Sequence, residues 1–308
     1  MVGDDIITSM LEYIRGLMNE QKASYREILR NLSHNFTYEI FPMQEQPSME
    51  MLSRFLPGTK VAISSWWKKG PDRTMAWTKE AQNLRLDVAP NVAARSVVNE
   101  EKLQEFGAVI KVTDKALIVG GDNLKPEGPW DSSLGLMEKL AELNLLPKSI
   151  GVAGYPEGNP KIPDEVLIRE LIAKQEFAKK HNIEMYITTQ ICLSATKIIN
   201  WVKKIRGLRI DLPVVVGIPG TANLERLIRF FEEFGFADSI QALKDKKKLV
   251  FTMGVGAVFG FKPDLIVRSL AKKIAGGPAD LNIIGLRAFT FNDLDESFRL
   301  HNDILNQD

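Results

Sequence analysis

A carboxylate inside an apolar segment is the first feature of this sequence that points to chemistry. Glu39 lies within Phe36–Phe41, between Tyr38 and Ile40. Moving a charged carboxylate out of water is costly unless it is paired or protonated. Burial would favour the protonated form, so we interpret Glu39 as a general acid that works near neutral pH. The alternative is that Glu39 points outward and pairs with a lysine of a helix.

Other polar residues follow apolar segments further along the chain. Asp122 comes after Gly120 and Gly121, which would let a ligand or another backbone approach closely, although a simple turn uses the same residues. Gln190 offers a donor and an acceptor, which suits a heterocycle with an amide edge, or an amide bonded to its own loop. Arg287 would meet either an anionic group or a surface carboxylate.

The segment Gly151–Pro160 joins an apolar stretch to a loop of special residues. After Gly154, the loop carries a hydroxyl, a carboxylate and a carboxamide on Tyr155, Glu157 and Asn159. Barrels of α/β type place their active groups at such strand-to-loop junctions. We therefore expect this loop to line a ligand site. The alternative is a rigid turn whose prolines and glycines only set the path of the backbone.

Several familiar catalytic arrangements do not fit the sequence. His34, His181 and His301 are far apart and stand at none of these strand ends, which argues against a catalytic triad and a histidine-ligated metal. The single cysteine, Cys192, excludes an internal disulfide and a cysteine-rich metal site. We therefore predict no metal site. The remaining groups can bind and protonate a heterocycle, and redox chemistry would come from a bound cofactor.

The apolar pattern predicts an N-terminal helix, near 6–31, followed by alternating strands and helices. Strands are expected near 36–41, 60–65, 84–89, 115–119, 149–153, 185–189, 213–217 and 282–288. Helices are expected near 48–55, 73–82, 98–106, 132–145, 164–181, 195–206, 222–234, 238–247, 262–275 and 293–306.

This order favours an α/β fold, a (β/α)8 TIM barrel with an extra N-terminal helix. The competing fold, an open doubly wound sheet, would need a glycine-rich phosphate loop after its first strand, where this chain has Pro42–Glu45. No linker or internal repeat divides the sequence. We therefore expect a single domain, 1–308, made of a helical extension over 1–32 and a barrel over 33–308.

Composition and charge narrow the class of protein. The chain has 308 residues, of which 44% are hydrophobic and 26% charged, as in a soluble globular enzyme. A net charge of +1 suggests no nucleic-acid partner. No apolar run reaches the roughly 18–20 residues that span a bilayer, and Asp4 and Asp5 do not suit a signal peptide. We expect a cytoplasmic enzyme with no membrane partner.

Taken in order, five short motifs resemble those of the methylenetetrahydrofolate reductase family. No single motif is specific to the family, but the occurrence of all five in this order at predicted strand ends is fairly specific. The similarity covers nearly the whole chain after the N-terminal helix. That family is a (β/α)8 barrel, so the resemblance agrees with the predicted fold. The motifs are Tyr38–Pro42, Gly120–Asp122, Gly154–Glu157, Thr189–Gln190 and Phe289–Asn292.

The resemblance implies an oxidoreductase that converts 5,10-methylenetetrahydrofolate to 5-methyltetrahydrofolate, with NADH or NADPH as the hydride source. By resemblance, Glu39 matches the general acid, which protonates a folate nitrogen so that the methylene bridge opens to an iminium. Asp122 matches a catalytic aspartate beside the pterin and flavin, and Gln190 matches the glutamine that contacts the pterin. Arg287 and Phe289 complete the predicted substrate-binding residues.

Departures from the family concern the flavin. Gly120 replaces a usual arginine, and Asn91 and Asn159 replace usual histidines, which removes donors to a diphosphate and a flavin ring. The chain therefore looks closest to a branch that works without tightly bound flavin. The alternative is that Arg95 or Lys174 binds FAD differently. The predicted cofactor-binding residues are Asn91, Gly121, Tyr155, Glu157, Asn159 and Lys174.

Two other functions fit the same residues. A folate-binding barrel without reductase activity would explain the lost cofactor groups, although binding alone does not need a buried acid at Glu39. A folate-dependent one-carbon lyase or methyl-transfer enzyme would turn folate over without oxidising a nicotinamide. The sequence does not choose between NADH and NADPH. The apolar stripe of the N-terminal helix would pack on the barrel or on a second subunit of a homo-oligomer.

Overall fold

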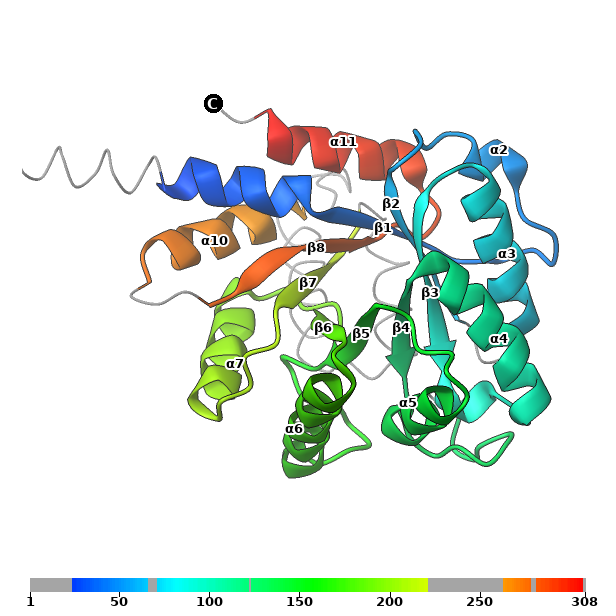
Figure 1. The fold of residues 1–308 in the computed structure, drawn as a ribbon. Coiled ribbons are helices and arrows are strands. Elements are labelled where there is room, and N and C mark those ends of the chain that lie inside the picture. Colours follow the sequence, from blue (N-terminus) through cyan, green and yellow to red (C-terminus); the bar gives the residue numbers. More distant parts are fainter. Residues whose placement is uncertain (1–23, 66–70, 122, 221–262, 278–280, 307–308) are drawn as a thin grey trace, which may run out of the picture.

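The computed structural model describes residues 24–65, 71–121, 123–220, 263–277 and 281–306. Within them, eight parallel strands form a closed barrel in which each strand pairs with its neighbours in sequence and β8 pairs with β1 (Figure 1). The predicted TIM barrel is confirmed. The strands are β1 (Phe36–Ile40), β2 (Lys60–Ile63), β3 (Asp87–Ala93), β4 (Lys115–Val119), β5 (Ser149–Gly154), β6 (Glu184–Thr189), β7 (Val214–Pro219) and β8 (Ile283–Phe289).

Helices surround the barrel and alternate with its strands (Figure 1). The expected N-terminal helix is described only over 24–34, and the helices expected near 222–234 and 238–247 lie outside the described residues. The division into one domain stays a prediction. The helices are α2 (Met49–Leu52), α3 (Pro71–Asn83), the 3-10 helix η2 (Ala94–Ser96), α4 (Glu100–Thr113), α5 (Ser133–Glu142), α6 (Asp164–His181), α7 (Ala195–Gly207), α10 (Asp264–Ala275) and α11 (Leu294–Leu305).

Two boundaries differ from the expected ones for identifiable reasons. Strand β3 begins later and continues through Pro90, which is tolerated because the pairing of β3 with β4 starts only at Asn91. Helix α4 continues past the expected end near 106, through Gly107. A side chain at Gly107 would collide with Leu145, since a Cβ there would lie 2.5 Å from the Leu145 Cδ1 atom. This glycine therefore permits close packing and does not end the helix.

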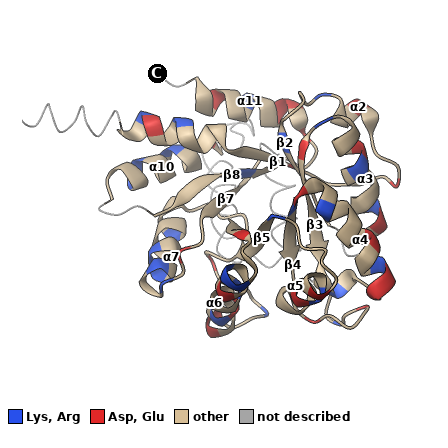
Figure 2. Cartoon of the chain, in the orientation of Figure 1, with Lys and Arg blue, Asp and Glu red and all other residues tan. Residues whose placement is uncertain are grey.

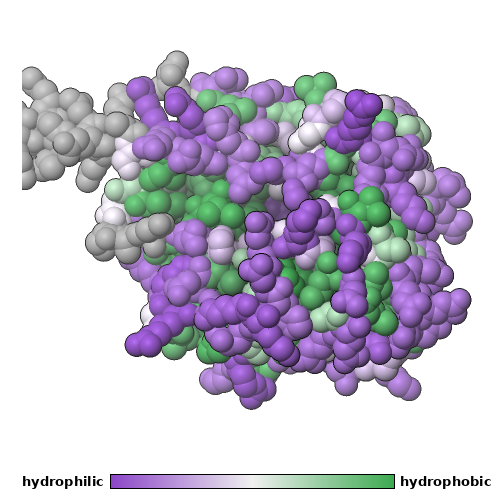
Figure 3. Space-filling model, viewed as in Figure 1, coloured by the Kyte–Doolittle hydropathy of each residue, from purple (hydrophilic) through white to green (hydrophobic). Residues whose placement is uncertain are grey.

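The outer surface of the barrel is polar. Both signs of charge are interspersed on the outer helices in Figure 2, and hydrophilic residues cover most of the face shown in Figure 3. Hydrophobic residues appear between them on that face, around α10 and β8. In the described part of the chain, no helix is both long and apolar enough to cross a membrane.

Alternating side chains give each strand two different faces. On β1, Tyr38 and Ile40 belong to the hydrophobic core between the barrel and its helices. The residue between them, Glu39, instead lines a cavity inside the barrel. The same alternation on β8 places Leu286 in the core and Arg287 at the cavity. On these two strands the apolar core thus lies outside the barrel, and the charged residues lie inside.

A histidine connects β1 to the helices behind it. The hydroxyl of Tyr38 lies 2.6 Å from Nδ1 of His301 on α11, and Nε2 lies 3.0 Å from the carbonyl oxygen of Ser33. A carbonyl can only accept, so Nε2 carries the hydrogen and Nδ1 accepts one from Tyr38. The ring also stacks on Phe36, with centroids 4.2 Å apart. This cluster fixes β1 from the outside.

We expect this cluster to make the fold sensitive to acid. Burial lowers the pKa of His301, and the nearby His34 lowers it further, against the raising effect of the Ser33 carbonyl. Because the folded pKa lies below the unfolded value of about 6.5, stability is fully present above that pH and is lost as pH falls through the lower folded pKa. Urea unfolding between about pH 8 and pH 5 measures this loss.

The matched comparison is His301→Gln, which removes the titrating ring. Its free energy of unfolding should be lower than that of the wild type at high pH and should fall less as the pH is lowered. His181→Gln at the end of α6 serves as the control and should keep the pH dependence of the wild type. An unchanged pH slope in His301→Gln would show that other groups cause the acid sensitivity.

Candidate active site

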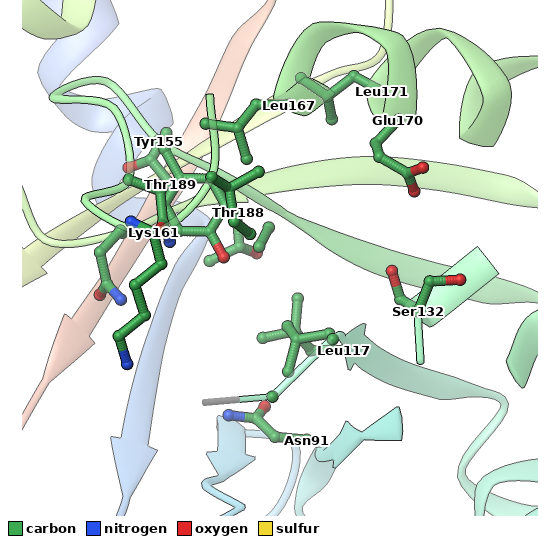
Figure 4. Close-up of a pocket in the computed structure, with 18 of the residues that line it drawn as sticks. Asn91, Leu117, Ser132, Tyr155, Lys161, Leu167, Glu170, Leu171, Thr188 and Thr189 are labelled. Atoms are coloured by element: carbon green, nitrogen blue, oxygen red, sulfur yellow. The ribbon is translucent and has the colours of Figure 1, made fainter. Parts of the chain in front are cut away.

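A cavity of about 610 Å³ opens at the carboxyl ends of the strands. In Figure 4, residues of the barrel strands face others from α6 across this space. Such a size suits a small-molecule ligand. The cavity brings together most of the residues that the sequence singles out as site residues, namely Glu39, Asn91, Gly121, Tyr155, Asn159, Lys174, Gln190, Arg287 and Phe289.

Two predicted site residues are not in this list. Asp122 lies outside the described residues, so its predicted catalytic role stays a prediction. Glu157 does not line the cavity. Its carboxylate oxygen lies 3.4 Å from Nζ of Lys197 on α7, and only 8% of its side chain is exposed. The ion pair of Glu157 with Lys197 therefore connects the loop after β5 to helix α7.

Glu39 lines the cavity and accepts hydrogen bonds from three side chains. Nε of Arg287 donates to Oε2 at 2.8 Å, and Nδ2 of Asn91 donates to Oε1 at 3.2 Å. The hydroxyl of Ser64, just after β2, also donates to Oε1. Only 3% of the Glu39 side chain is exposed. Three donors on or just after three other strands therefore converge on one buried carboxyl group and fix its orientation.

The partner of Arg287 is a finding that the sequence reasoning missed. It offered a ligand anion or a surface carboxylate, whereas the structure pairs Arg287 with the buried Glu39. A signal was present, because closure of a barrel places the last strand beside the first. In the observed register Thr37 faces Arg287 and Glu39 faces Phe289, so the two charged residues lie diagonally across the seam.

The end of β8 clamps the backbone of β1. The hydroxyl of Thr290 donates to the carbonyl oxygen of Glu39 at 2.6 Å. The side chain of Asn292 both accepts from the backbone N–H of Phe41 at 2.9 Å and donates to its carbonyl at 2.8 Å. Asn292 has a φ of 62°, a left-handed conformation that asparagine tolerates better than most residues. The motif Phe289–Asn292 thus positions Glu39 through its own backbone.

Strand β5, which precedes the loop carrying Tyr155 and Glu157, leaves room inside the barrel at Gly151. A Cβ at Gly151 would lie 2.8 Å from both Leu117 Cδ1 and Tyr186 Cζ, so only glycine lets the Tyr186 ring lie across the interior. Burial raises the pKa of Tyr186, which therefore remains a neutral phenol. Further along, Asn159 accepts from the backbone N–H of Lys161 at 2.8 Å and shapes the loop at the cavity.

The α6 side of the cavity holds a buried cation. Lys174 is 8% exposed, and its Nζ lies 3.7 Å from a carboxylate oxygen of Glu170, which is an ion-pair distance longer than a hydrogen bond. Burial lowers the pKa of Lys174, against the raising effect of Glu170. On the β6 side, the buried hydroxyl oxygen of Thr188 has no hydrogen-bond partner. Both groups line the cavity and suit a ligand that carries negative charge and polar atoms.

Gln190 follows directly after β6, and the oxygen of its side-chain amide already accepts a hydrogen bond. Its Oε1 accepts from the backbone N–H of the next residue, Ile191, at 3.1 Å. The bond to its own loop, one of the two alternatives from the sequence, is therefore present, and the residue also lines the cavity. No group of three or more His, Cys, Asp or Glu side chains in the described ranges could hold a metal ion.

Comparison with known proteins points to one family. A methylenetetrahydrofolate reductase 1 of Schizosaccharomyces pombe is 31% identical over 150 residues, which are 46% of this chain and 22% of that protein. A methylenetetrahydrofolate reductase 2 of Saccharomyces cerevisiae is 27% identical over 118 residues, 36% of this chain and 19% of that protein. The matches thus span about a fifth of the relatives' length, and no family model matches the chain. They support membership of the methylenetetrahydrofolate reductase family.

The buried ion pair generates a prediction about stability. Arg287→Gln leaves the Glu39 carboxylate buried without its cationic partner, and breaking such a pair costs about 3–5 kcal/mol. The double variant Glu39→Gln/Arg287→Gln removes both charges and should recover most of this loss. Urea unfolding of the wild type, both single variants and the double variant at one pH gives the coupling free energy. Additive effects of the two single substitutions would contradict the pairing.

Proposed function

We propose that this chain, as a member of the methylenetetrahydrofolate reductase family, reduces 5,10-methylenetetrahydrofolate to 5-methyltetrahydrofolate with NADH or NADPH. The observation that carries the proposal is the buried carboxyl group of Glu39 in the barrel cavity, surrounded by donors on three other strand ends. Opening the methylene bridge of the substrate requires an acid at a folate nitrogen. A positioned carboxyl group in a cavity of this kind provides one.

In the proposed reaction, Glu39 transfers a proton to the substrate nitrogen, and the bridge then opens to an iminium. Glu39 is left as a carboxylate, which is the form that its three donors stabilise. Ser64 is the donor that can also accept, because a hydroxyl rotates, whereas the Arg287 guanidinium cannot. In the acid form of Glu39, the Ser64 hydroxyl can turn and accept a hydrogen bond from the carboxyl group.

The cavity also suits the nicotinamide nucleotide, which supplies a hydride when bound. The buried ammonium of Lys174 would contact phosphate, and the unpartnered hydroxyl of Thr188 would contact a polar ring substituent. Gly121 and the loop carrying Tyr155 and Asn159 lie at the same cavity. Leu117 adds an apolar surface on the β4 side, as labelled in Figure 4. These residues keep the reacting groups in contact and limit the access of water.

The proposal makes Glu39→Gln the decisive substitution. Glutamine keeps the size of the side chain but has no acidic proton, and its NH2 group cannot accept the hydrogen bonds that one carboxylate oxygen receives. Turnover should therefore fall by about 100- to 10,000-fold while folate binding is largely retained. NADH and NADPH oxidation with methylenetetrahydrofolate gives the rate, and equilibrium titration gives the binding. Glu184→Gln, an exposed carboxylate at the start of β6, is the matched control. A near-normal rate in Glu39→Gln would remove Glu39 from the mechanism.

The same assay separates the reductase from its two rivals. Folate binding by the wild type without nucleotide oxidation would support a folate-binding barrel that has lost the reaction. Consumption of the folate without nucleotide oxidation would support a lyase or a methyl-transfer enzyme. Both results would contradict the proposal, since a reductase must oxidise one of the two nucleotides in proportion to the folate that it reduces.

We further propose that the protein works without tightly bound FAD, because Gly120, Asn91 and Asn159 replace family residues that can donate to a flavin. The purified protein should then lack an absorbance band at about 450 nm, where a bound flavin absorbs. An absorption spectrum of the native and of the heat-denatured protein measures this directly. A yellow chromophore in stoichiometric amount would contradict this part of the proposal and leave the reductase assignment intact.

A further inference from the structure

We propose that Arg287 is a positioning residue that holds Glu39 in place and stabilises the carboxylate left after proton transfer. This inference rests on the proposed function and assigns Arg287 a different role from substrate binding. The observation behind it is that the guanidinium contacts two side chains of the chain itself, Glu39 and Asn91, inside the barrel.

The three side chains form a closed ring of hydrogen bonds. Arg287 donates from Nε to Glu39 at 2.8 Å and from Nη2 to Oδ1 of Asn91 at 2.7 Å. Asn91 in turn donates from Nδ2 to Glu39 at 3.2 Å. The ring joins β8, β1 and β3, and its members are 2%, 2% and 8% exposed for Arg287, Glu39 and Asn91. A planar guanidinium with directed donors can complete this ring, whereas a lysine ammonium cannot match both directions.

The charge of Arg287 acts on one state of Glu39. A guanidinium stays protonated at any working pH, so it attracts the carboxylate and not the neutral acid. In a site with little water this attraction is weakly screened. Arg287 therefore favours release of the proton to the substrate and opposes recapture. An arginine that bound the substrate would instead improve affinity before the proton moves.

Other charged residues line the same cavity, namely Arg95, Asp131, Lys161, Asp164, Glu170, Lys174 and Lys204, and none of them is within ion-pair or hydrogen-bond distance of Glu39 in the described part of the chain. Ser64 on the β2 side is neutral, and Tyr186 on β6 is a phenol that feels the charges of Arg287 and Asp87. Asp87 is already paired with Lys115, at 2.7 Å from its second oxygen. Lys174 reaches the cavity from α6 and pairs with Glu170. Arg287 is thus the only cation among them that contacts Glu39.

The test compares Arg287→Lys and Arg287→Gln with the wild type in steady-state kinetics. Both variants should lower kcat by up to about 100-fold, the scale of a misplaced catalytic group, while KM for methylenetetrahydrofolate stays within about twofold. Arg287→Gln should also move the pH limb at which kcat declines to higher pH, because the neutral acid persists longer without the positive charge. Arg287→Lys, which keeps the charge, should leave that limb closer to the wild-type position.

Arg30→Gln, an exposed arginine on the helix over 24–34, is the matched control and should change neither constant. A large rise in folate KM with unchanged kcat would overturn the inference and make Arg287 a substrate-binding residue. An unmoved pH limb in Arg287→Gln would overturn it as well. If Arg287→Gln does not fold, the kinetics of Arg287→Lys test the inference, since a lower kcat with a nearly unchanged KM supports it and a raised KM with an unchanged kcat contradicts it. If the wild-type protein shows no turnover of methylenetetrahydrofolate with either nucleotide, the proposed function is contradicted, and this inference is contradicted with it.

Discussion

The contact between Glu39 and Arg287 is the interaction on which the site depends. Two opposite charges, each almost fully buried, face one another across the seam where β8 meets β1. Neither charge would be stable in that place alone, because removing an ion from water costs several kcal/mol. The ring through Asn91 and the clamp from Thr290 and Asn292 then leave Glu39 little freedom in its side chain or its backbone. Closure of the barrel therefore also brings Glu39 and Arg287 together.

Strand β1 shows how one short segment serves the core and the site together. Tyr38 faces outward and is held by His301, while the next residue, Glu39, faces inward and is held by Arg287. The period of two along a strand makes this possible, since neighbouring side chains point to opposite sides. A shift of β1 by one residue would exchange the two faces and destroy both sets of contacts. Contacts on the outer face thus maintain the register on which the inner face relies.

The fold was largely predictable from the sequence, and the details of the site were not. Apolar segments alternating with helical patterns were enough to predict the strands. The polar residues at the predicted strand ends were enough to identify most of the site residues that line the cavity. The end of β3 at Pro90 and the end of α4 at Gly107 were predicted wrongly. Local propensity indicated that each element ends there, whereas packing in the structure allows each to continue. The pairing of Arg287 with Glu39 and the turn of Glu157 toward Lys197 depend on which residues meet in space. Spacing along the chain carries little of that information, apart from the closure that brings the last strand to the first.

The two halves of the buried ion pair are 248 positions apart in the chain. During synthesis, the segment around Glu39 emerges long before its partner, and the amino-terminal parts of a chain generally begin to fold first. Until β8 docks, an ionised Glu39 in a partly formed barrel would be a buried charge without a counterion, which disfavours premature closure. Closure and neutralisation would then occur together when β8 docks, and contacts of such long range should make this step slow. A barrel without its last strand would leave the buried Glu39 without its cationic partner, so the same ion pair would act both in the site and in the assembly of the barrel.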